Sequence, residues 1–162
     1  MSKSMREKLD NLRQRKNKNY QNIVYYSYKM SVHKHINDHE LKRLEHSIKS
    51  LREFNNEICV YLFCDDNNFI SPDFCSNYDV NFRSFVDGFD HDMLSAWSIH
   101  RWYNLKYFEG RSCNILYLDS DTIFYDDPQY LFDTYCHRDV YGREEFGFRH
   151  DPNTGGGRGI RE

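Results

Sequence analysis

The chain has 162 residues, of which 39% are hydrophobic and 17% are aromatic. This length suits one domain with a sizeable core, and the aromatic content is too high for a disordered chain despite a mean hydropathy of -0.88. The formal net charge is -3, whereas nucleic-acid-binding proteins usually carry a net positive charge, so we expect no nucleic acid as a partner.

The apolar runs are strand-sized, which predicts no transmembrane segment. Residues 1–20 are basic and lack the apolar core of a secretory signal, so we expect a solvated tail or helix, with contact to an acidic membrane surface as the less favoured alternative. The cysteines lack CxxC spacing, which favours reduced thiols and a cytoplasmic location. They are Cys59, Cys64, Cys75, Cys113 and Cys136.

The first half of the chain predicts alternating strands and helices. Residues 22–28 (NIVYYSY) and 57–64 (EICVYLFC) are rich in β-branched and aromatic residues and predict buried strands. Between them we expect a helix that Asp38 caps, because apolar residues then recur on one helical face. These residues are Leu41, Leu44, Ile48 and Leu51. Residues 71–73 (Ser-Pro-Asp) predict a turn or the start of a short helix.

In the second half, residues 79–86 alternate like a third strand. Residues 91–108 carry a helical period that Gly110 should end. The apolar strand at 114–118 comes next.

Beyond that strand, Asp127 and Pro128 predict the start of a short helix that ends near Tyr135, and residues 139–148 suit one more strand. The alternation of strands with helices predicts a largely parallel sheet in a Rossmann-like α/β arrangement. The domain should span residues 21–150, and the Gly-rich segment 151–162 should be a flexible connection.

The most informative motif is Asp119-Ser120-Asp121, which follows the apolar strand. In an extended backbone Asp119 and Asp121 project to the same side, at the strand end where α/β sheets bind ligands. Two adjacent carboxylates repel unless a cation lies between them, so the pair predicts a site for a divalent ion. The alternative is that both are solvated turn residues.

Arg101 lies at the centre of the apolar stripe of the helix predicted at 91–108. A buried guanidinium needs an anionic partner, such as one aspartate of the motif or a ligand phosphate. In the alternative, the aliphatic stem of Arg101 covers the core and its charged head reaches water.

Several segments in order resemble the GT-A fold, that of the nucleotide-diphospho-sugar glycosyltransferases. They cover most of residues 22–150, and the strand with its DxD motif, acidic turn, Pro and Leu-Phe is the most specific. The quoted segments are NIVYYSY, SIKSL, ICVYLFCDD, AWSIHRWYNLKYF and ILYLDSDTIFYDDPQYLF.

This resemblance implies that Asp119 and Asp121 hold Mn²⁺ or Mg²⁺ on the diphosphate of a nucleotide-sugar donor, with Asp119 also contacting the donor. It further implies that Ser27 and Tyr28 meet the nucleotide, and that Arg101 lies near the diphosphate or sugar. Asp65 or Asp66 would reach the base or ribose. The acceptor is an unknown glycan, protein or small molecule, and the catalytic residue is unknown.

The sequence departs from the GT-A pattern after Asp121, where the family's acceptor site and further ligands usually lie. Only Glu144 and Glu145 offer carboxylates in a plausible strand there, and ordinary surface charge is their favoured role. We therefore expect a C-terminally truncated chain with an incomplete acceptor half. A truncated or inactive nucleotide-binding relative remains an alternative.

Other interpretations of the acidic motif fit less well. A haloacid-dehalogenase-like phosphatase carries its DxD on the opening strand, whereas three predicted strands precede Asp119. An EF-hand is disfavoured because Ile123 occupies its fifth position. A metal site of His33, His35 and His39 lacks a further ligand nearby.

Overall fold

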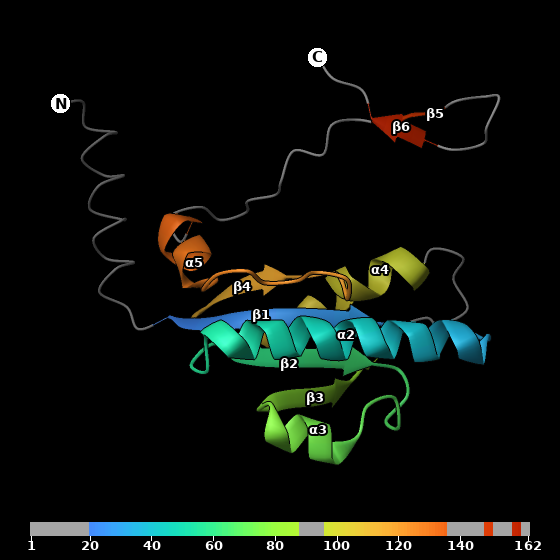
Figure 1. Cartoon of the computed structure of the whole chain (residues 1–162), viewed down its shortest axis with the longest axis horizontal. Helices are drawn as coiled ribbons and strands as arrows, with labels where there is room; N and C mark the ends of the chain where they lie inside the picture. Colours follow the sequence, from blue (N-terminus) through green and yellow to red (C-terminus); the bar gives the residue numbers. More distant parts are fainter. Residues whose placement is uncertain (1–19, 88–95, 136–147, 151–156, 160–162) are drawn as a thin grey trace.

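The structure is a computed structural model that describes residues 20–87, 96–135, 148–150 and 157–159 (Figure 1). Its elements alternate between strands and helices along most of this length. In chain order they are β1 (Gln21–Tyr28), α2 (Lys34–Phe54), β2 (Cys59–Cys64), α3 (Pro72–Asn77), β3 (Val80–Ser84), α4 (Ala96–Tyr103), the 3₁₀-helix η1 (Asn104–Phe108), β4 (Cys113–Tyr117), α5 (Gln129–Tyr135), β5 (Phe148–His150) and β6 (Gly157–Gly159).

The first four strands form one sheet in the order β3-β2-β1-β4, and all three pairings are parallel. The predicted α/β class with a parallel sheet is therefore confirmed, and the arrangement is compatible with a Rossmann-like fold. The chain adds β2 and β3 on one side of β1 and then returns to add β4 on the other side. The strand order thus reverses between β1 and β4, the kind of position where such sheets bind ligands.

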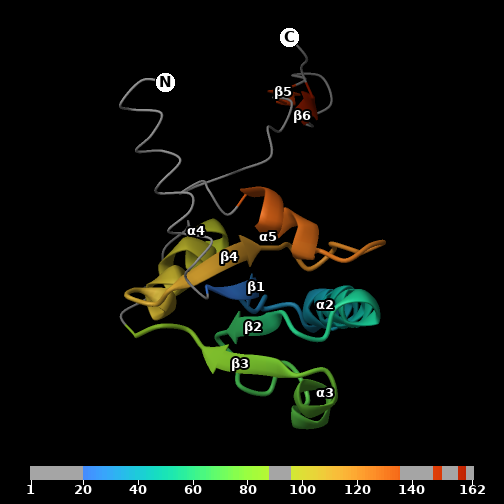
Figure 2. The same cartoon turned by 90° about the vertical axis from the view of Figure 1, so that its left-hand side faces the viewer.

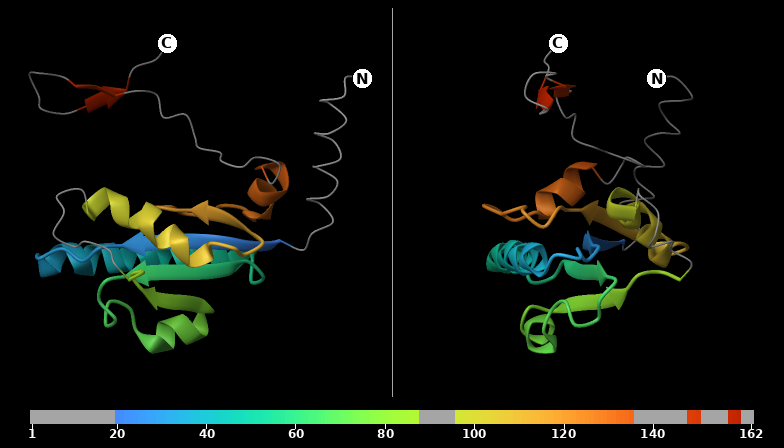
Figure 3. Two further views of the ribbon diagram at one scale, coloured as in Figure 1. Left: turned by 180° about the vertical axis from the view of Figure 1, so that it is seen from behind. Right: turned by 90° about the vertical axis from the view of Figure 1, so that its right-hand side faces the viewer.

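Helices cover both faces of this sheet, so successive side chains of β1 enter two different cores. Val24 and Tyr26 pack with residues of α2, whereas Ile23 and Tyr25 pack with Phe108 of η1. All four β1 side chains are almost fully buried. Figure 2 shows α2 and α4 on opposite sides of the strands, and Figure 3 shows α4 from behind.

The start of α2 differs from the prediction. The helix begins at Lys34 with His33 as its N-cap residue, so Asp38 lies inside the helix and does not cap it. Buried Asn37 explains the earlier start, because its Oδ1 accepts hydrogen bonds from Ser31 N and Tyr28 Oη, both at 2.8 Å. These bonds fix the chain between β1 and α2 ahead of Asp38.

The predicted helix at 91–108 is not one continuous α-helix. Its described part is α4 to Tyr103 followed by η1, a tightening common at helix ends, and residues 91–95 lie outside the described part. Gly110 follows with a φ of 75°, a left-handed conformation that glycine adopts without a Cβ clash. The predicted stop at Gly110 is confirmed.

Both predicted short helices form. Ser71 Oγ accepts from Phe74 N at 3.1 Å at the start of α3, and Asp127 Oδ1 accepts from Gln129 N at 2.8 Å at the start of α5. Of the predicted strand 139–148, only Phe148 is described, in β5. Residues Gly157–Gly159, which lie in the segment expected to be a flexible connection, form strand β6, paired antiparallel with β5.

Candidate ligand-binding site

A crevice of about 270 Å³ lies beside the carboxyl ends of β1 and β4. It is therefore located where the strand order reverses. Residues of β1, α2, α4 and the turn after β4 line it. The polar residues and tyrosines among them are Tyr26, Ser27, Tyr28, Glu40, His100, Arg101, Tyr117, Asp119 and Ser120.

Four residues singled out in the sequence line this crevice together: Ser27, Tyr28, Arg101 and Asp119. They come from the end of β1, from α4 and from the segment after β4, which parallel pairing of β1 with β4 brings to one edge. Asp121 is not among the lining residues. The predicted grouping is thus present for four residues of the set.

The backbone of the acidic motif is a turn. β4 ends at Tyr117, and Thr122 N donates to the Asp119 carbonyl oxygen at 3.1 Å. The expectation of an extended backbone through Asp119 and Asp121 is therefore wrong, and strand alternation does not place these side chains. The backbone hydrogen bond from Leu118 N to the Tyr25 carbonyl oxygen, at 3.0 Å, is the last contact of this segment with β1. The turn follows directly after it.

Asp119 is held by two groups in the crevice. Its Oδ1 accepts a hydrogen bond from Tyr117 Oη at 2.9 Å and lies 3.7 Å from Nη1 of Arg101. The Arg101 guanidinium carbon also lies 5.5 Å from the centroid of the Tyr117 ring. Arg101 is 34% exposed, so it is neither buried in the core nor fully in water, and its pairing with an aspartate of the motif matches the hypothesis.

Asp121 does not line the crevice, and its contact is with α2. Its Oδ2 lies 3.5 Å from Nη2 of Arg43, and Nη1 of Arg43 donates to Glu40 Oε1 at 2.9 Å. Glu40 also accepts a hydrogen bond from Ser120 Oγ. Partial burial opposes ionisation of Glu40, but the hydrogen bonds from Ser120 and Arg43 hold its pKa below the usual value. Glu40 and Arg43, which the sequence reasoning missed, therefore attach the acidic turn to α2.

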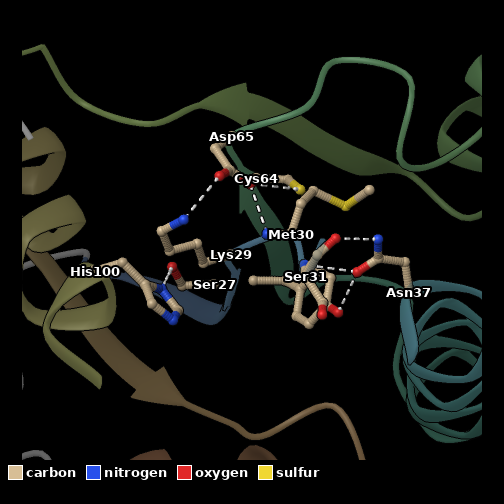
Figure 4. A network of polar contacts seen from close by, with 9 residues as sticks. Ser27, Lys29, Met30, Ser31, Asn37, Cys64, Asp65 and His100 are labelled. Atoms are coloured by element: carbon tan, nitrogen blue, oxygen red, sulfur yellow. Dashed lines mark hydrogen bonds and ion pairs between the residues drawn. The ribbon is translucent and has the colours of Figure 1, made fainter. Parts of the chain in front are cut away.

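A buried polar network supports the crevice at the end of β1. Ser27 Oγ and His100 Nδ1 are hydrogen-bonded at 2.6 Å (Figure 4), and Asn104 Nδ2 donates to the same hydroxyl at 3.2 Å. His100 is buried and its ring stacks on Phe85. The sequence carried no signal for His100, because a single histidine in an amphipathic helix has many ordinary roles.

Asp65 lies apart from the crevice lining, where it holds the segment after β1. Its Oδ1 accepts from Met30 N at 2.8 Å, and its Oδ2 lies 3.7 Å from Lys29 Nζ (Figure 4). Asp66 Oδ1 accepts from Asn68 N at 2.8 Å within its own turn. Both contacts serve loop structure.

Tyr28 differs from Asp65 because it does line the crevice. Burial is the largest cause that raises its pKa to about 12, and its hydroxyl is bonded to Asn37, so it acts as a neutral donor within the protein. Its ring stacks on Phe69 with centroids 4.7 Å apart.

Within residues 20–87 and 96–135, no three His, Cys, Asp or Glu side chains are grouped closely enough to hold a metal ion between them. His33, His35 and His39 are part of that search and do not form such a group. A Mg²⁺ ion takes as few as one or two protein carboxylates and completes its shell with phosphate and water, so the site at Asp119 and Asp121 stays a prediction.

No known protein family, curated protein or solved structure matches this chain. Among the described helices, none is both long and apolar enough to span a bilayer. Four described cysteines, Cys59, Cys64, Cys75 and Cys113, are free thiols, as expected. The described part of the chain is thus an α/β domain with a parallel sheet and a polar crevice at the reversal of its strand order.

Proposed function

We propose that this chain is a cytoplasmic glycosyltransferase of the GT-A type that binds a nucleotide-diphosphate sugar in the crevice. It would transfer the sugar to a glycan, protein or small-molecule acceptor. The observation that carries the proposal is the position of Asp119: its side chain lines the crevice beside the ends of β1 and β4, where the strand order reverses.

Asp119 and Asp121 would hold the divalent ion, Mn²⁺ or Mg²⁺. When bound, such an ion offsets the negative charge that grows on the departing nucleotide diphosphate. Both carboxylates are more than half exposed, at 66% and 56%, so they can take a ligand without a large rearrangement of the core.

The guanidinium groups of Arg101 and Arg43 support the same proposal. Each is paired with one aspartate of the motif, at 3.7 Å and 3.5 Å. A cation on the aspartates would compete with these pairs, and the arginines would then be available to phosphate oxygens, for which guanidinium is well suited. The proposal therefore assigns the cation to the two carboxylates and the diphosphate to the neighbouring guanidiniums.

Ser27 would contribute a hydroxyl at the nucleotide side of the crevice. Its hydrogen bonds to His100 and Asn104 fix the direction of the side chain, so its role is one of positioning and binding. Tyr28 would supply part of the wall, because its hydroxyl is already bonded to Asn37.

The test is calorimetric titration of the full chain with a panel of nucleoside diphosphates, with and without Mn²⁺. We expect Mn²⁺-dependent binding that Asp119→Asn and Asp121→Asn each abolish while circular dichroism shows an intact fold. Asp73→Asn, on the exposed first turn of α3, is the matched control and should bind normally. Binding that persists in Asp119→Asn, or that EDTA leaves unchanged, would contradict the proposal.

Sugar transfer requires its own measurement, because nucleotide binding alone also fits an inactive relative. Incubation with labelled nucleotide sugars and a set of candidate acceptors should give a labelled product. Binding without any transfer would assign the chain to the inactive relatives. Release of inorganic phosphate from small phosphoesters would favour a phosphatase.

A further inference from the structure

A second charged cluster lies on the face of the sheet opposite to α2. It consists of Arg83 on β3, Tyr107 on η1 and Arg111 shortly before β4, and we call it the Arg–Tyr–Arg cluster. Arg83 Nε donates to Tyr107 Oη at 3.1 Å. The guanidinium carbons of Arg83 and Arg111 lie 5.9 Å and 4.3 Å from the centroid of the Tyr107 ring. Two cationic groups thus converge on one partly exposed phenol.

The tyrosine rings next to these arginines, Tyr61 and Tyr107, pack against buried phenylalanines of the core. The Tyr107 ring contacts Phe63 and Phe108 with centroids 5.4 Å and 5.2 Å apart, and both phenylalanines are almost fully buried. Tyr61 contacts Phe108 at 5.1 Å and lies 6.0 Å from the Arg83 guanidinium carbon. Contacts with these fixed rings restrict the conformations of the arginine side chains. Such pre-organisation reduces the conformational entropy that is lost when a ligand binds.

The positive charge of the cluster is local and not neutralised by acids of the described residues. In the part of the chain that the structure describes, no carboxylate lies within ion-pairing distance of Arg83 or Arg111. The whole chain carries a formal net charge of -3, so the positive charge of the cluster is not part of a generally basic surface. Both guanidiniums lie next to the same Tyr107 ring, and like charges repel unless an anion lies between them.

The phenol oxygen of Tyr107 accepts a hydrogen bond from Arg83, and the guanidinium of Arg111 lies over the Tyr107 ring. Hydrogen bonds from Arg83 and then Arg111 are the main causes that lower the pKa of Tyr107 below its usual value. Arg83 also donates through Nη1 to the Phe82 carbonyl oxygen at 2.7 Å. Its Nη2 has no protein acceptor among the described residues, so donors of the cluster remain free for a ligand.

We propose that the Arg–Tyr–Arg cluster is an anion site that binds a phosphate group, separate from the crevice and independent of the proposed glycosyltransferase function. A phosphate group matches the cluster in charge, because it carries up to two negative charges against two guanidiniums. Its oxygens match the forked donors of arginine, and the Tyr107 hydroxyl can donate to one of them.

The test is a titration of the full chain with inorganic phosphate, followed by NMR at the arginine Nε–Hε groups. We expect saturable shifts of the Arg83 and Arg111 signals, with small shifts at Arg52, whose guanidinium already donates to four backbone carbonyl oxygens. Sodium chloride at matched ionic strength should not reproduce them. The double variant Arg83→Gln/Arg111→Gln should bind at least about tenfold more weakly, and Lys42→Gln, which removes one exposed charge on α2, should bind like the native chain.

Three outcomes would overturn the proposal. Equal shifts with chloride would show a general response to ionic strength, and phosphate binding that survives in the double variant would place the bound anion elsewhere. Binding to phosphatidylserine vesicles without a saturable response to free phosphate would show that the arginines sense a charged surface. Mn²⁺-dependent nucleotide binding should be unchanged in the double variant, so failure of one proposal leaves the other standing.

Discussion

Arg43 and Asp121 are 78 positions apart in the sequence, yet their side chains meet at 3.5 Å. Arg101 makes the corresponding contact with Asp119 at 3.7 Å from a helix on the other face of the sheet. Each aspartate of the acidic turn therefore has an arginine from a different helix. Because all four side chains are substantially exposed, each pair is worth at most about 1 kcal/mol, which a bound divalent cation can exceed.

The first prediction concerns Arg43. Its replacement by glutamine removes a competitor for the Asp121 carboxylate, so the affinity for Mn²⁺ without nucleotide should rise by up to about fivefold, the equivalent of about 1 kcal/mol. Titration followed by electron paramagnetic resonance of free Mn²⁺ would measure this change. Lys42→Gln removes one charge from an exposed neighbouring position on α2 and controls for the general loss of positive charge. Equal affinities in the two variants would show that the Arg43 pair does not compete with the ion.

The second prediction concerns the network at the end of β1. Ser27→Ala removes the hydroxyl that His100 Nδ1 and Asn104 Nδ2 share, and both partners are buried. Because buried polar groups that lose a partner carry a desolvation penalty, the free energy of unfolding should fall by about 1–3 kcal/mol. Urea denaturation measures it directly.

Ser84→Ala is the matched control for that substitution. Ser84 Oγ also makes one hydrogen bond, to Asn67 Oδ1 at 2.7 Å, but at an exposed position. Its loss should change the free energy of unfolding by no more than about 0.5 kcal/mol. If both variants lost the same stability, the network around Ser27 would not be a significant support of the crevice.

The third prediction concerns the ionisation of Tyr107. Its pKa is lowered by hydrogen bonds from Arg83 and Arg111, whereas burial raises the pKa of Tyr28 to about 12. Tyr107 should therefore ionise well before Tyr28 in an NMR titration of ring-labelled tyrosine. Arg83→Gln should raise the Tyr107 pKa, because a donor that favours the phenolate is lost. A Tyr107 pKa that does not respond to this substitution would contradict the contact.

The sign of the linked stability change follows from the direction of that shift. A group whose pKa is lower in the folded state contributes stability above its unfolded-state pKa, which is near 10 for tyrosine. This contribution is lost as the pH falls through the lowered folded-state pKa of Tyr107. The contribution is therefore fully present only above about pH 10, the unfolded-state pKa.

Local sequence patterns determined most of the secondary structure. The apolar runs at 22–28 and 57–64 contain most of β1 and all of β2, and the caps at Ser71 and Asp127 correctly indicated α3 and α5. These signals depend on neighbouring residues alone, so they can be read without the fold. The predicted start of α2 at Asp38 was wrong because the actual start depends on the buried side chain of Asn37, which is hydrogen-bonded to Tyr28 and Ser31.

The sequence by itself predicted an α/β domain with a parallel sheet, and the family resemblance implied that Ser27, Tyr28, Arg101 and Asp119 belong to one site. Only the tertiary structure decided the turn at Asp119–Thr122, the ion pair of Asp121 with Arg43 and the pairing of His100 with Ser27. The physical reason is the sequence separation of the residues that make each kind of contact. Strand and helix periods arise from contacts between near neighbours, whereas these side-chain pairs form only after parallel pairing of β1 with β4 and packing of α2 and α4 bring distant segments together.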